Sequence, residues 1–170
     1  MNDLFFKKLI LLLSFTVFVI FPYQANAEVK IKLIEGKKFS DYQITGNSRK
    51  KSLEVLQKDL TKLFSKQAAE YLDSSQNLEI DITNIDLPGI YHYAYGPTNK
   101  DIRIVDSLSP YKLYFNYRLL NASDELLKEG SHKIKDFFDS ASVVRKNRNR
   151  GTVGYYETEL IKWFKGLSEN

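Results

Sequence analysis

The segment Tyr111–Leu120 has the sequence YKLYFNYRLL, in which large apolar side chains occupy every second position. Alternate residues of a strand face the same side of a sheet, so the pattern predicts a strand with one buried face. The buried face is expected to carry Tyr111, Leu113, Phe115, Tyr117 and Leu119. The turn-forming residues Asn121-Ala122-Ser123-Asp124 follow, and we expect Leu126–Phe137 to return as the antiparallel partner.

Two further segments show the same alternation. Val29–Leu33 and Leu78–Thr83 each place aliphatic residues between polar ones, which predicts two half-buried strands. The phase of the second pattern changes at Asn84, and a β-bulge there would turn Ile85 and Leu87 back toward the core.

Two segments have helical periodicity. Between Arg49 and Leu72, apolar residues recur at intervals of three and four, and Asn47 or Ser48 is suited to cap the start. A second helix is expected from a cap at Thr152 to about Lys165, with Gly166 ending it. Its buried stripe would comprise Tyr156, Leu160, Trp163, Phe164 and Leu167.

The remaining segments are shorter. We expect an aromatic loop over Ile90–Lys100 and a short strand over Asp101–Val105. Pro110 then marks a sheet edge, a bend or the start of a new strand. The order of elements predicts an α+β fold: a two-layer sandwich with a mostly antiparallel sheet of four to five strands and two helices on one face. The opposite face of the sheet should be polar and wet, or a partner surface.

The first 27 residues have the layout of a secretory signal peptide. Lys7 and Lys8 precede a run of apolar or small residues from Leu9 to Phe21, and Ala25-Asn26-Ala27 supplies small residues at the two positions that signal peptidase reads. We predict cleavage between Ala27 and Glu28, which leaves a single α+β domain over residues 28–170 and no stable membrane span. Since Glu28 rather than cysteine would follow the cut, the product should be free of lipid and periplasmic or secreted.

The composition narrows the possible functions. The 170 residues include no cysteine, so the exported domain must be stable without disulfides. The net charge is +4, and it falls to about +3 without the leader, which is far from that of a dedicated nucleic-acid binder. We therefore expect no nucleic-acid partner.

Several short motifs together resemble the bacterial family catalogued as domain of unknown function 3016. The motifs are Phe39-Ser40-Asp41, Asp86-Leu87-Pro88-Gly89, Asp101-Ile102-Arg103-Ile104-Val105, Ser109-Pro110, Tyr117-Arg118-Leu119, Leu127-Lys128-Glu129-Gly130, Lys135-Asp136-Phe137, Tyr156-Glu157 and Trp163-Phe164. Their order and spacing cover nearly all of the chain from Val29 to Leu167. The resemblance implies a periplasmic setting and brings no particular activity with it.

Candidate catalytic and metal sites are sparse in the sequence. His92 and His132 are isolated, so we expect neither a metal site nor a cofactor. No serine lies in a Gly-x-Ser-x-Gly motif. Four aspartates lie near expected strand ends, and two of them could serve as paired acids of a hydrolase. The simpler interpretation is structural: Asp86 forms a turn, and Asp101 pairs with Arg103 on one face of a strand. The other two aspartates are Asp41 and Asp106.

Two surface segments are the candidate binding residues. Arg145, Arg148 and Arg150 lie in a basic loop suited either to anionic groups or simply to solvent. Tyr91, Tyr93 and Tyr95 could stack on a sugar, line a protein interface, or fold back over the core edge.

These features favour a non-catalytic binding or accessory module of the cell envelope, whose partner is an envelope protein or an anionic envelope component. Two alternatives remain open. The first is a hydrolase of an envelope polymer that uses paired carboxylates. The second is an assembly protein that binds partners by adding a strand to a sheet edge.

Overall fold

The computed structural model describes residues 27–138 and 151–169. The leader up to residue 26 and the basic residues Arg145, Arg148 and Arg150 lie outside these ranges. The strands are β1 (Glu28–Leu33), β2 (Asn77–Asp86), β3 (Ile90–Tyr95), β4 (Lys100–Ile104), β5 (Pro110–Leu120) and β6 (Leu126–Phe137). The helices are α2 (Arg49–Tyr71) and α4 (Glu157–Ser168), with 3-10 turns η1 (Gly36–Lys38) and η2 (Gly151–Tyr156).

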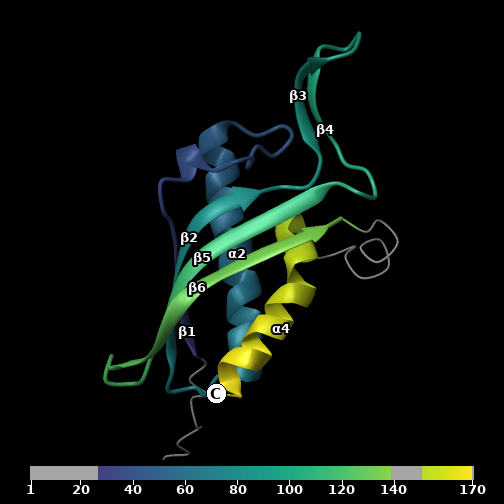
Figure 1. The fold of residues 1–170 in the computed structure, drawn as a ribbon. Coiled ribbons are helices and arrows are strands. Elements are labelled where there is room, and N and C mark those ends of the chain that lie inside the picture. Colours follow the sequence, from purple (N-terminus) through teal and green to yellow (C-terminus); the bar gives the residue numbers. More distant parts are fainter. Residues whose placement is uncertain (1–26, 139–150, 170) are drawn as a thin grey trace, which may run out of the picture.

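The main sheet contains four strands in the order β1-β2-β5-β6. β1 runs parallel to β2 because α2 connects them, whereas β2, β5 and β6 pair antiparallel. Both helices lie against one face of this sheet (Figure 1). The predicted α+β class, the two layers and the mostly antiparallel sheet are therefore confirmed.

Aromatic side chains between the layers form the centre of the core. Phe64 of α2 and Trp163 of α4 both contact Phe115 of β5, with ring centroids 5.4 and 5.0 Å apart. The rings meet edge to face, the arrangement that the charge distribution of aromatic rings favours. The stripe predicted for the last helix is correct, since Tyr156, Leu160, Trp163, Phe164 and Leu167 are all buried.

The start of α2 and the bulge in β2 follow the sequence predictions. The Ser48 hydroxyl, rather than Asn47, accepts a hydrogen bond from the Lys51 backbone N–H at 3.2 Å. In β2, Ile82 pairs with Phe115 but Asn84 pairs with Tyr114, so Thr83 is the extra residue. The bulge returns Ile85 to the core, where it is fully buried.

The start of the last helix differs from the prediction. Thr152 does not cap an α-helix; it lies in η2, and its backbone N–H donates to Asp59 at 3.2 Å. Val153 and Tyr156 of η2 are buried, so this tight turn is held against the core before α4 begins at Glu157. The helix also continues through Gly166 to Ser168, because Gly166 does not adopt the left-handed conformation that ends a helix.

The aromatic segment is not a loop. β3 and β4 form an antiparallel hairpin that projects beyond the four-stranded sheet (Figure 1). The turn between them contains Gly96 and Asn99 at positive φ, and Tyr95 pairs with Lys100 across it. The sequence pattern concealed the strand because both of its faces carry aromatic or aliphatic side chains, which removes the usual alternation.

Candidate functional site

An arginine on β4 helps to attach the hairpin to the body of the molecule. Arg103 of β4 reaches the loop before α2, where its guanidinium binds both carboxylate oxygens of Asp41 at 2.6 and 2.9 Å. The same group donates to the Gln43 carbonyl at 2.8 Å and to the Pro88 and Gly89 carbonyls at 3.2 Å. We call this group of residues the Arg103 clamp.

Backbone pairing places Asp41 where Arg103 can bind it. Asp41 lies beside the end of β2: its N–H donates to the Ile85 carbonyl, and its own carbonyl accepts from Leu87. The loop after η1 is therefore attached to β2 by the same residue whose side chain binds Arg103. The clamp thus joins three segments: this loop, the turn after β2, and the hairpin.

The clamp is largely shielded from water. The side chain of Arg103 is 11% exposed and that of Asp41 is 25% exposed. A two-pronged arginine–carboxylate pair is among the stronger polar contacts in proteins, and removing either partner would leave a charge poorly solvated. The centroid of the Tyr91 ring also lies 5.7 Å from the guanidinium carbon, in range of a cation–π contact.

Gly89 allows the start of β3 to lie close to the end of β4. Its φ is +83°, and a Cβ added there would lie 2.1 Å from the Ile104 carbonyl oxygen. A side chain at this position would therefore push the first residue of β3 away from the end of β4.

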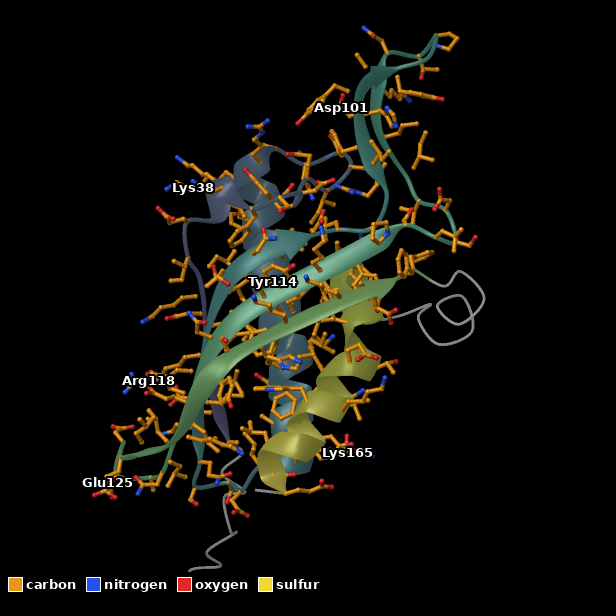
Figure 2. All side chains as sticks on the ribbon, in the orientation of Figure 1. Lys38, Asp101, Tyr114, Arg118, Glu125 and Lys165 are labelled. Atoms are coloured by element: carbon orange, nitrogen blue, oxygen red, sulfur yellow. The ribbon has the colours of Figure 1, made fainter. Side chains whose placement is uncertain are left out.

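The four candidate aspartates bind four different sets of partners. Asp41 binds Arg103, whereas Asp86 pairs with Lys112 at 2.7 Å, and this contact raises the pKa of Lys112. Asp101, on the projecting hairpin (Figure 2), accepts hydrogen bonds from the Tyr91 hydroxyl and the Ala94 N–H, both at 3.0 Å. The expected pairing of Asp101 with Arg103 is therefore wrong: Asp101 organises the bend in β3 instead.

The remaining aspartate stabilises a turn. Asp106 accepts from the Ser109 hydroxyl at 2.8 Å and from the Leu108 N–H at 3.1 Å. The hydrogen bond from Ser109, followed by that from Leu108, lowers the pKa of Asp106. All four aspartates therefore bind partners that hold the local structure in place.

The tyrosines predicted as binding residues differ in exposure. Tyr91 is half-buried against the clamp, and burial is the main cause that raises its pKa. Tyr93 and Tyr95 are 60% and 48% exposed. The Tyr93 hydroxyl raises the pKa of Arg49 at the start of α2, so this ring lies on the side of the hairpin that faces the helix end.

The other side of the hairpin is more apolar. Ile90 pairs with Ile104 across the strands, and both side chains are exposed. His92 pairs with Ile102, and its ring lies 5.2 Å from that of Tyr95. The hairpin therefore presents aliphatic and aromatic side chains to solvent on a support that the Arg103 clamp holds to the body.

The histidines have separate environments. His92 belongs to the hairpin, whereas His132 of β6 is half-buried beside Phe115 and Trp163, where burial lowers its pKa. Across residues 27–138 and 151–169, no group of three or more His, Asp or Glu side chains is placed to hold a metal ion.

A family model described as "protein of unknown function (DUF3016)" matches residues 27–166 of the chain. The chain belongs to the DUF3016 family. The resemblance of the sequence motifs to this family is thereby confirmed. The match begins one residue before β1 and ends within α4, so it includes every strand of this DUF3016 domain.

Two other comparisons assign no fold or function to the chain. The crystal structure of a lipoprotein from Neisseria meningitidis is 17% identical to the DUF3016 chain, with a TM-score of 0.24. The alignment covers 54% of this chain and about half (49%) of the lipoprotein, and at this TM-score it supports no conclusion about fold or function. A search of curated proteins found no match. In the described ranges, no helix is long and apolar enough to cross a membrane.

Sequence reasoning missed the residues that organise the site. Arg103 and Gly89 fall inside motifs quoted for the family, but their role depends on Asp41, which is 62 residues away from Arg103. The sequence feature that could have pointed to this pairing is the long polar segment before α2, because such a loop needs side-chain partners to be ordered.

Proposed function

We propose that this protein is an exported, non-catalytic binding or accessory module of the cell envelope, and that the β3–β4 hairpin is its principal contact surface. The proposed partner is an envelope protein or an anionic envelope component. Arg145, Arg148 and Arg150, which lie outside the described residues, are proposed to supply positive charge to the same contact.

The projecting hairpin is the observation that carries this proposal. A two-stranded hairpin alone is marginally stable in water, yet this one is fixed to the body by the Arg103 clamp. Exposed apolar side chains on a fixed support bind with less loss of conformational entropy than the same side chains on a mobile loop. Tyr93, Tyr95, Ile90 and Ile104 meet this description.

The contacts of the aspartates also support a binding role. Arg103 and Lys112 neutralise Asp41 and Asp86, and hydrogen bonds within turns engage Asp101 and Asp106. A hydrolase of the paired-carboxylate type needs one acid held protonated and a second held ready across the substrate. Carboxylates that maintain the shape of a hairpin and its attachment are poorly suited to that task.

Site-specific photo-crosslinking tests the contact surface. A photoreactive phenylalanine at Tyr95 should capture an envelope component in intact cells, whereas the same residue at Tyr114, on the open face of the main sheet, should not. Equal capture from both positions, or none from either, would contradict the hairpin assignment. A variant with Arg145, Arg148 and Arg150 changed to Glu together should lose most of the Tyr95 adduct, and an unchanged adduct would remove the basic segment from the proposal.

A further inference from the structure

The two edges of the main sheet differ in how they are covered. At the β1 edge, the Gln57 side chain of α2 donates to the Ile31 carbonyl at 3.1 Å and occupies one backbone acceptor. At the other edge, β6 is twelve residues long and, among the described residues, pairs with β5 alone. A long edge strand is a template for another strand unless its side chains prevent the pairing.

The backbone groups available on β6 can be assigned from one hydrogen bond. The Phe138 N–H donates to the Ser109 carbonyl at 2.8 Å, which makes these two residues a hydrogen-bonded pair of the antiparallel ladder. Such pairs alternate along the strand, so the even-numbered residues of β6 direct their backbone groups to β5. The N–H and C=O groups of Glu129, Ser131, Lys133 and Lys135 therefore point away from β5.

The charges of β6 are complementary to the same strand in reverse. Lys128 and Asp136 are the same number of residues from His132 along the strand, on opposite sides of it. The same is true of Glu129 and Lys135. In an antiparallel pair of two β6 strands centred on His132, Lys128 and Lys135 would therefore each lie opposite a carboxylate, and Lys133 would lie opposite Ser131. The two-fold symmetry of such a pair repeats both contacts, and no like charges lie directly opposite.

Neighbouring registers lack this complementarity. A two-fold axis perpendicular to the sheet keeps each residue on its own face, so only registers centred on a residue are allowed. Centring on Ser131 places Glu129 opposite Lys133, but it leaves Lys128 opposite Ile134 and Lys135 opposite Leu127. Centring on Lys133 places Glu129 opposite Phe137 and leaves no oppositely charged pair. The sequence of β6 thus favours one register.

We propose that the β6 edge binds β6 of a second copy of this chain, antiparallel and centred on His132, to form a continuous sheet across a two-fold dimer. Among the outward backbone positions, Glu129 then pairs with Lys135 and Ser131 with Lys133. The helices of both copies lie on the same face of the joined sheet, because the two-fold axis is perpendicular to it. The charges along β6 disfavour pairing with strands of other sequence and favour pairing with β6 of a second copy.

Sedimentation equilibrium of charge variants tests the dimer. Lys135→Glu places it opposite Glu129 twice in each dimer, and Glu129→Lys places it opposite Lys135 twice; each variant should weaken dimerisation by about tenfold or more. The double variant, Glu129→Lys with Lys135→Glu, restores opposite charges and should recover most of the affinity. Lys58→Glu, an equal charge change on the exposed side of α2, is the control and should have little effect.

Two results would overturn the proposal. The first is a monomeric protein at every concentration tested, and the second is a double variant that dimerises no better than the single ones. The absence of native cysteine allows a separate check of the register. Ser131→Cys and Lys133→Cys face each other in the proposed pair, at a Cα separation of about 5.5 Å that suits a disulfide. Under mild oxidation a mixture of the two variants should form a covalent dimer, and neither variant should do so alone; cross-linking that does not depend on mixing would contradict the register.

Discussion

Arg103 determines how the hairpin is held. Its side chain lies on β4, but its carboxylate partner is in the loop before α2 and its carbonyl partners are in that loop and in the turn after β2. A lysine at the same position would keep the positive charge and lose the planar fork that binds both oxygens of Asp41. The clamp is therefore a property of arginine and not of positive charge alone.

We expect Arg103→Lys to loosen the hairpin without unfolding the main sheet. The loss of a shielded two-pronged ion pair should cost about 2 kcal/mol, which corresponds to roughly thirty-fold more frequent opening. Amide hydrogen exchange in β3 and β4 should accelerate accordingly, while exchange in β2 and β5 should not. Arg118→Lys is the matched control, because its contact with Glu79 is largely exposed and should be worth less than about 1 kcal/mol. Equal exchange in the two variants would show that the clamp does not hold the hairpin.

The sequence predicted single residues well where the cause was local. A cap at Asn47 or Ser48 follows from the type of residue that precedes a helix, and Ser48 takes this position. The bulge at Thr83 follows from a change of phase within one strand. Arg103 could not be assigned to Asp41 in the same way, because that pairing exists only after three separate segments have come together.

At the scale of elements, β6 and α4 meet at His132. The imidazole lies beside the Phe115 and Trp163 rings, whose centroids are 5.5 and 5.9 Å away. Burial lowers the pKa of His132, and Glu159 of α4 opposes this effect in part. The contact between strand and helix therefore favours the neutral ring.

This contact makes stability depend on pH. In the unfolded chain His132 should take up a proton near its ordinary pKa of about 6.5, while the folded protein resists protonation. The stabilisation is therefore complete above about pH 6.5 and declines as the pH falls through the lower pKa of the folded state. Urea unfolding between pH 7.5 and 5 should show this decline, and His132→Gln should reduce its slope. His92→Gln, on the hairpin, is the control; an equal reduction in both variants would exclude the contact as the cause.

Elements were predictable from the sequence when one face was buried and the other was wet. β1, β2, β5 and α2 all have this asymmetry, and their positions agree with the predictions to within a few residues. β3 lacks it, since Ile90, Tyr93 and Tyr95 are all exposed, and its sequence therefore predicts a loop. η2 is stabilised by tertiary burial of Val153 and Tyr156, which local propensity does not reveal.

At the scale of the whole molecule, the open face of the main sheet carries one row of alternating charge. Lys30, Glu79, Arg118 and Glu129 are neighbours across the four strands. They border a shallow cavity of about 560 Å³. The far face is thus polar, as the sequence predicted, and the two distinctive surfaces of the molecule are the apolar hairpin and the β6 edge.

The export of the protein is the prediction on which an envelope role depends. Cleavage between Ala27 and Glu28 would leave β1 complete, because this strand begins at Glu28. Ala27 itself is buried at the margin of the core, so a substitution there would disturb both processing and packing. Ala25 lies before the described residues and is the cleaner position for a test.

We therefore expect Ala25→Arg to block processing, because a large charged side chain does not fit where signal peptidase requires a small one. N-terminal sequencing should find Glu28 first in the unmodified protein and the intact leader in the variant. Asn26→Gln changes the intervening residue, which is not restricted to small side chains, and should be processed normally. Fractionation should place the processed protein outside the cytosol. A product that begins at Met1 in the unmodified protein would remove the basis for an envelope function, whereas the contacts of the clamp and the pairing proposed for β6 would be unaffected.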